Sequence, residues 1–150
     1  MLDDRPEAIK TACSENHVGP VWDDDCVEIM IAPETRNFPY LQIAVNALGV
    51  YRVCEHRTAG RQLFEVAEPA LKTTARRAPN GWDVRVAIPL ELVRKYLDEG
   101  RTGRLGIFRT AASRSPAQCS AINPAPGRGY HNPEEYARLV LAAGMEEDGE

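Results

Sequence analysis

One stretch near the N-terminus places an aromatic ring next to a run of acids. Trp22 is followed directly by Asp23, Asp24 and Asp25, and Glu28 lies inside the apolar-rich run that comes next. A buried carboxylate is costly unless another group pairs with it or hydrogen-bonds to it. An indole can cover the apolar face of a pyranose while carboxylates accept hydrogen bonds from its hydroxyls, so these residue types suit a sugar-binding surface. On this stretch alone, an Asp-rich turn leading into a strand, with Trp22 in the core, is the favoured alternative.

The same acids raise the question of a metal. Three consecutive aspartates supply hard oxygens, of which calcium takes six to eight, but their spacing does not fit the calcium loop of helix-loop-helix proteins. Structural calcium is therefore a minority interpretation, and no other cofactor is expected. The four cysteines contain no Cys-x-x-Cys pair, so a zinc site is not expected, and disulfides are left open; they are Cys13, Cys26, Cys54 and Cys119.

Size and charge exclude several classes of partner. A chain of 150 residues, 43% hydrophobic and 27% charged, has the composition of one soluble globular domain. A net charge of −4 gives no basic surface for nucleic acid. No apolar run approaches the roughly 20 residues of a membrane span, and residues 1–6 have no apolar signal segment. Neither nucleic acid nor a membrane is therefore expected as a partner. The localisation is left unknown.

The hydrophobic pattern predicts short strands separated by turns. Strands are expected at 26–31, 40–45, 82–88, 105–110 and 136–142, with further ones possible at 50–54 and 71–75 and an ambiguous stretch at 64–72. One short helix is expected at 91–97, and residues 113–133 are expected to form a long loop. This order indicates an all-β, antiparallel β-sandwich of immunoglobulin or jelly-roll type with one short helix. Residues 1–20 form an irregular lead, 21–142 the sandwich and 143–150 an acidic tail.

Five segments in this order resemble carbohydrate-binding module family 9 and its wider family-9-like group. They are Val-Trp-Asp-Asp-Asp-Cys-Val-Glu at 21–28, Tyr-Leu-Gln-Ile-Ala-Val-Asn at 40–46 with Gly49, Gly-Trp-Asp-Val-Arg-Val-Ala-Ile-Pro at 81–89, Leu-Gly-Ile-Phe-Arg at 105–109, and Tyr-His-Asn-Pro-Glu-Glu-Tyr-Ala-Arg-Leu at 130–139. The resemblance covers most of residues 20–142.

The resemblance implies a non-catalytic β-sandwich that binds a mono- or oligosaccharide, often beside a glycoside hydrolase. It implies that Trp22 stacks on the sugar, that Glu28 accepts sugar hydroxyls and that Arg109 donates to them. Asn46 matches the end of the strand-turn motif. Tyr130 is the nearest substitute for a second aromatic, which the family carries after the arginine strand and which is absent from residues 110–128 here.

A second departure concerns the N-terminus. Members of the family carry several strands before the Trp-Asp segment, and this chain is expected to begin near the end of one of them, at Asp3-Asp4-Arg5-Pro6. Missing strands would expose sheet edges and part of the core, which favours self-association. The alternative function is therefore a truncated or degenerate sandwich that acts as an interaction module without sugar binding.

Two further functions are weaker alternatives. A glycoside hydrolase needs two carboxylates about 5 to 10 Å apart, and nothing in the spacing of the acids selects such a pair. A haem-binding sandwich needs axial ligands, for which Met30 with His56 or His131 is the available pair. The sequence thus predicts a protein that is not an enzyme.

Overall fold

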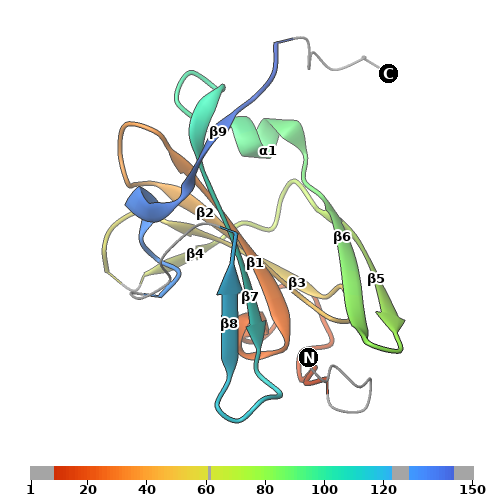
Figure 1. Ribbon diagram of the computed structural model, residues 1–150. Coiled ribbons are helices and arrows are strands. Elements are labelled where there is room, and N and C mark those ends of the chain that lie inside the picture. Colours follow the sequence, from red (N-terminus) through yellow and green to blue (C-terminus); the bar gives the residue numbers. More distant parts are fainter. Residues whose placement is uncertain (1–8, 61, 123–128, 144–150) are drawn as a thin grey trace.

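The protein is an all-β, antiparallel, sandwich-like fold with one short helix, as the sequence predicted (Figure 1). The computed structural model describes residues 9–60, 62–122 and 129–143. Regular structure in these ranges is almost entirely strand, with the single α-helix α1 at Leu90–Arg94. Within the same ranges, no helix has the length and apolar character to cross a membrane. The proposed remnant at residues 3–6 and the tail from 144 lie outside the described residues.

Among the described residues, the larger layer is a seven-stranded sheet in the order β4-β3-β2-β1-β7-β8, with β9 also paired to β7. β8 and β9 share one edge of β7, since β8 pairs with residues 108–111 and β9 with residues 102–105. The strands are β1 (Cys26–Pro33), β2 (Tyr40–Asn46), β3 (Tyr51–His56), β4 (Leu63–Glu65), β7 (Thr102–Ala111), β8 (Gln118–Ala121) and β9 (Ala137–Val140).

The second layer consists of a β-hairpin and α1. The hairpin strands are β5 (Lys72–Ala78) and β6 (Gly81–Ala87). Along β6, Val84 and Val86 are half-buried and face the main sheet, whereas the residues between them are exposed, which confirms the alternation that the sequence predicted. With α1 and the segment after it, they cover a core built mainly from β-branched and leucine side chains of the main sheet, including Ile31, Leu41 and Ile43.

The other face of the main sheet is buried too. Met30, Tyr40, Phe108 and Tyr136 form a second apolar cluster there, so every residue of β2 is buried. Successive side chains of a strand point to opposite faces. Main-sheet side chains that alternate along each strand with those of the first core therefore point away from the hairpin. They line a second, more polar surface on this outer face of the sheet.

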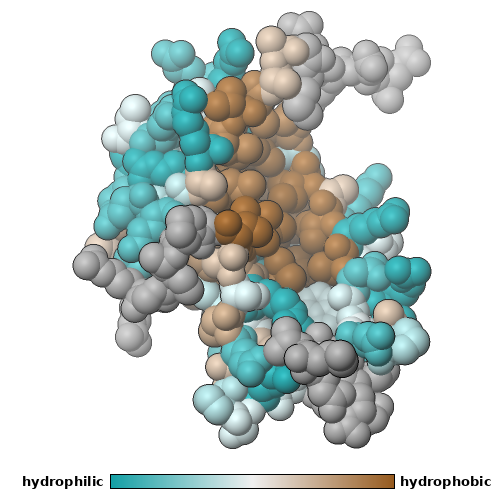
Figure 2. Space-filling view, viewed as in Figure 1, coloured by the Kyte–Doolittle hydropathy of each residue, from teal (hydrophilic) through white to brown (hydrophobic). Residues whose placement is uncertain are grey.

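The cover of the first core is incomplete. Ile29, Leu105, Val84, Val86 and Ile88 all pack against it but stay half-buried. Figure 2 shows apolar side chains gathered in a hollow between the main sheet and the β5–β6 hairpin. β6 pairs with β5 alone in the described part of the chain, so its second edge has no strand partner there.

Several boundaries differ from those expected from sequence. The segment 113–133 contains β8 and a short 3-10 helix at Pro133–Glu135, because β8 pairs with the far edge of β7. The ambiguous stretch contributes the end of β4 and the first residue of β5, and α1 is shorter than the predicted helix. Cysteines 13, 26, 54 and 119 are all free thiols.

Candidate functional site

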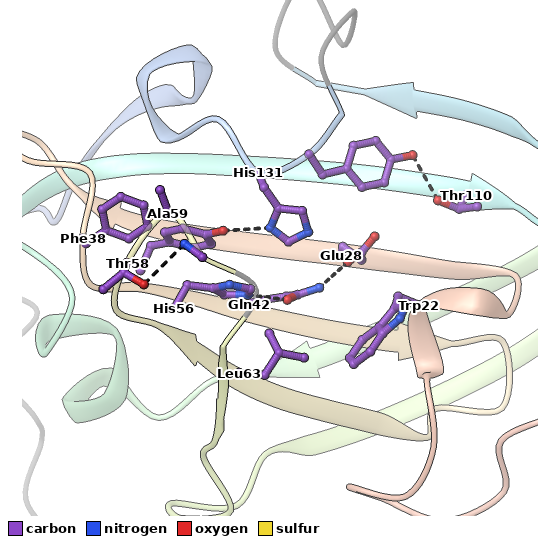
Figure 3. A pocket seen from close by; sticks show the side chains of 13 residues that line it. Trp22, Glu28, Phe38, Gln42, His56, Thr58, Ala59, Leu63, Thr110 and His131 are labelled. Carbon is purple, nitrogen blue, oxygen red and sulfur yellow. Dashed lines mark hydrogen bonds between the residues drawn. The ribbon is translucent and has the colours of Figure 1, made fainter.

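A cavity of about 770 Å³ lies on the outer face of the main sheet, away from the hairpin (Figure 3). Its floor is formed by Glu28 from β1, Tyr40 and Gln42 from β2, His56 from β3 and Thr110 from β7. Paired residues of neighbouring strands, and residues two apart along one strand, point to the same face of a sheet. Met30, two residues after Glu28, pairs with Gln42; Gln42 pairs with Cys54, two residues before His56; and Glu28 pairs with Phe108, two residues before Thr110. The register therefore places the floor side chains on one face.

Loops and the short 3-10 helix η2 (Val21–Asp23) complete the walls. Trp22 comes from η2, Phe38 from the turn before β2, residues 58–60 from the loop after β3, and Tyr130 and His131 from the segment before β9. In Figure 3, Trp22 and Phe38 stand at opposite ends of the floor. Rings from distant parts of the sequence therefore enclose one polar floor.

A chain of short hydrogen bonds runs across this floor. Gln42 Nε2 donates to Glu28 Oε1 at 2.6 Å, and His56 Nε2 lies 2.6 Å from Gln42 Oε1. Since Gln42 Oε1 can only accept, His56 carries its proton on Nε2. Glu28 is 4% exposed, and its second oxygen, Oε2, has no hydrogen-bond partner among the described residues.

Burial shifts the acid-base behaviour of these groups. Loss of solvation raises the pKa of Glu28 to about 7, although the hydrogen bond from Gln42 opposes the rise. Burial lowers the pKa of His56 to about 4, with a further contribution from His131. Burial also lowers the pKa of His131. At neutral pH both imidazoles are therefore neutral, and Glu28 is divided between its acid and its carboxylate.

Aromatic rings support this network on one side. The ring of Tyr40 stacks on His56 with a centroid distance of 4.4 Å and packs against Phe38 at 5.6 Å. Burial raises the pKa of Tyr40 to about 12, so its hydroxyl keeps its proton, and its oxygen is hydrogen-bonded to His131 Nδ1 at 2.8 Å.

Trp22 and Tyr130 form the remaining aromatic surfaces. The guanidinium of Arg52 lies 5.1 Å from the centroid of the half-buried Trp22 indole, a cation–π contact that supports one face of the ring. Arg52 is itself held by Glu65 at 3.1 Å. Tyr130 stacks on Phe108 at 4.3 Å, and its hydroxyl is 3.0 Å from Thr110 Oγ1.

The structure corrects the predicted placement of Arg109. Arg109 pairs with Val27 in the β1–β7 register, whereas Phe108 pairs with Glu28. Because faces alternate along a strand, the side chain of Arg109 lies on the opposite face of the sheet from Glu28 and does not line the cavity. Trp22 and Arg109 therefore do not converge on one surface.

Asn46 is also corrected, because its side chain is committed to the fold. It is fully buried, and its Nδ2 donates to the Cys13 carbonyl and to Asp24 Oδ2, both at 3.0 Å. Its Oδ1 accepts from the backbone N–H groups of Leu48 and Val50. These bonds use its full hydrogen-bonding capacity and shape the β2–β3 turn, so Asn46 has nothing to offer a ligand.

Two of the three aspartates hold chain segments together. Asp24 accepts from the backbone N–H groups of Ala12 at 2.8 Å and Cys13 at 3.0 Å. Asp25 accepts from the N–H of Lys10 and from both the N–H and the hydroxyl of Ser113. Their oxygens face N–H donors rather than a common centre, and no cluster of three potential metal ligands occurs among the described residues. The expectation of structural calcium thus gains no support from Asp24 and Asp25.

The haem alternative needs Met30 as an axial ligand, but Met30 is fully buried in the second apolar cluster and does not line the cavity.

Sequence reasoning missed Gln42, Tyr40, Phe38 and Thr110 as cavity residues. One signal for two of them was present: Tyr40 and Gln42 alternate with apolar Leu41 and Ile43, which places both on the face opposite the core.

Comparisons with known proteins support the fold. No protein-family model matches this chain, and no curated protein matches it. The fold is similar to a solved structure from Bacteroides uniformis, described as a "putative carbohydrate-binding protein", with a TM-score of 0.68 and 16% sequence identity. The match covers 88% of this chain and 67% of that one. At this identity, the likeness shows a shared all-β fold.

Proposed function

We propose that the protein binds a mono- or oligosaccharide without catalysis, in the cavity on the outer face of the main sheet. The observation that carries this proposal is the buried Glu28 carboxyl, whose Oε2 has no partner among the described residues and which lies on the floor between aromatic walls. A buried acceptor without a partner is costly, and a ligand hydroxyl would satisfy it. Trp22 and Tyr130 supply the apolar surfaces that a sugar ring packs against.

The size and polarity of the cavity fit this ligand class. About 770 Å³ falls within the roughly 300–1,000 Å³ of small-molecule sites and accommodates one or two sugar rings. Gln42 and His56 place donors and acceptors on the strand floor, and His131 adds a polar group from the wall, which is how a site selects among hydroxyl arrangements. The name carried by the Bacteroides uniformis structure agrees with this proposal, and membership of the family-9-like group is part of it.

Binding without hydrolysis follows from the acids of the cavity. Glycosidases use two carboxyl groups flanking the bond that is cleaved. Glu28 is the one carboxylate among the described residues that line the cavity. Hydrolysis of a sugar bound here would therefore lack its second carboxylate.

Isothermal titration calorimetry with mono- and oligosaccharides tests the proposal. We expect dissociation constants between micromolar and millimolar, on the order of −8 to −4 kcal/mol. Trp22→Ala should weaken binding about two- to tenfold, because one stacking surface is worth roughly 0.5–1.5 kcal/mol. Trp82→Ala is the matched control, since Trp82 lies on β6 in the other layer and should leave affinity unchanged. Absence of heat with every sugar, from folded protein, would reject the proposal.

An interaction module is the second candidate. The observation in its favour is the half-buried apolar surface between the main sheet and the hairpin. Association through that surface is independent of the cavity, which lies on the other face, so the two functions can be tested separately.

A further inference from the structure

We propose that the cavity prefers a saccharide carrying a protonated amine over neutral and acidic sugars, with the ammonium group bound at Oε2 of Glu28. This inference rests on the proposed function and specifies its ligand class. It starts from geometry: the carboxyl is 4% exposed, is fixed by Gln42 through Oε1, and offers Oε2 to the cavity.

The charges that line the cavity have one sign. No lysine or arginine occurs among the lining residues that the structure describes. The two histidines are neutral at neutral pH, because burial lowers the pKa of each, and Gln42 Oε1 fixes the proton of His56 on Nε2. Glu28 is thus the sole source of formal charge in the described lining, and its charge is negative.

Groups around the cavity do not reverse this sign. Arg52 contacts the cavity wall through the Trp22 indole, but it is paired with Glu65 at 3.1 Å, which offsets its charge. Asp23 on η2 adds negative potential and contributes to the raised pKa of Glu28. Other titratable groups on this face include thiols and phenols that burial keeps protonated, namely Cys26, Cys54, Tyr40, Tyr130 and Tyr136. Cys119, an exposed thiol, pairs with Thr110 on the same face.

Two interactions therefore favour binding of a cation in this site. An ammonium N–H donating to a carboxylate forms a charge-assisted hydrogen bond, which is stronger than one from a hydroxyl. The faces of Trp22 and Tyr130 also attract a positive group. A uronate brings a second negative charge to a buried carboxylate, and like charges in a desolvated site repel strongly.

Calorimetry at pH 7 with sugars that share one ring tests this preference. Glucosamine, glucose and glucuronate form one series, and galactosamine, galactose and galacturonate form a second that covers the other common ring configuration. In the series that binds, the amino sugar should bind at least tenfold more tightly than the neutral sugar, and the uronate should give no measurable heat. Glu28→Gln should reduce the ratio of amino to neutral affinity to about one. Glu91→Gln, the same substitution at an exposed acid on α1 outside the cavity, should preserve the ratio.

A second readout uses the unaltered protein and so does not depend on how a variant folds. At pH 6 the amine is charged and Glu28 is mostly protonated, so seating the ammonium must displace the Glu28 proton to the buffer. Titrations in two buffers with different heats of ionisation should show release of close to one proton for the amino sugar and none for the neutral sugar. Equal affinities and no proton release, with sugars still binding, would overturn the amine preference alone. If neither these sugars nor the oligosaccharides of the first calorimetric panel bind, the proposed function itself is rejected.

Discussion

At the scale of single residues, Glu28 illustrates how a ligand site conflicts with stability. A carboxyl that is nine-tenths or more buried, with only Gln42 as a described hydrogen-bond partner, is a net cost to the folded state when it ionises. The pKa of Glu28 in the folded protein, about 7, lies above the value of 4.5 expected for an unfolded chain. Between these values the folded state retains a proton that the unfolded state has released.

The sign of the effect follows from this proton. Stability associated with Glu28 is fully present below about pH 4.5 and is lost as the pH rises through about 7. We predict that Glu28→Gln stabilises the protein relative to the natural chain by a margin that grows from about 1 kcal/mol at pH 5 to about 3 kcal/mol at pH 8. Urea denaturation at both pH values measures this margin.

His56 requires the comparison to be made as a difference. Its folded-state pKa of about 4 is below the usual 6.5, so its contribution has the opposite sign and is lost as the pH falls. The loss is common to the natural chain and to Glu28→Gln, and it cancels between them. A margin that is the same at pH 5 and pH 8 would show that Glu28 ionises normally.

At the scale of elements, the Asp24–Asn46 pair fastens the segment before η2 to the main sheet. Asp24 is 1% exposed and accepts from Ala12, Cys13 and Asn46, while Asn46 also binds the Cys13 carbonyl. Removal of either side chain leaves buried partners without hydrogen bonds, at about 1–3 kcal/mol for each group. These two residues therefore act as one unit.

We predict that Asp24→Ala and Asn46→Ala each lower the free energy of unfolding by about 3 kcal/mol. The double variant should lose clearly less than the sum, because the two side chains share a hydrogen bond. Urea denaturation of the four proteins completes the cycle. Asp23→Ala is the control, and as an exposed position it should change stability by less than about 0.5 kcal/mol. If the losses in unfolding free energy of the two single variants add fully in the double variant, Asp24 and Asn46 do not act as one unit.

Sequence reasoning was sound where the signal is local and failed where it depends on register. The alternation from Trp82 to Ile88 predicted the inner and outer faces of β6, because that signal lies within one strand. The face of Arg109 depends on which residue of β1 lies opposite it, and a shift by one residue reverses the answer. The role of Asn46 depends on a partner 22 residues away in sequence, which no local pattern contains.

At the scale of the whole molecule, the two faces of the main sheet have different properties. One face carries the cavity, and the other carries a core whose cover is partial, with Ile29, Val84 and Val86 half-buried. Burial of apolar surface is favourable by about 25 cal/mol for each Å² removed from water. Contact between copies of the chain through this surface would recover part of that free energy.

We predict weak self-association that depends on protein concentration, measured by sedimentation velocity. Val86→Thr keeps the shape and strand preference of the side chain while adding a hydroxyl, and it should weaken the association. Val18→Thr makes the same change at a position 55% exposed, outside this surface, and should leave it unchanged. A monomer at all concentrations, or equal effects of the two variants, would argue against association through this surface.

The central claim is that a sugar binds on the outer face of the main sheet, over Glu28 and Trp22. A ¹H–¹⁵N NMR titration with the best-binding saccharide tests it most directly, because the indoles of Trp22 and Trp82 report on the two layers in one experiment. The account predicts saturable shifts of the Trp22 indole N–H and of the Gln42 side-chain amide, with the Trp82 indole unmoved. Shifts centred on Trp82 and the β5–β6 hairpin, with Trp22 and Gln42 unchanged, would contradict it.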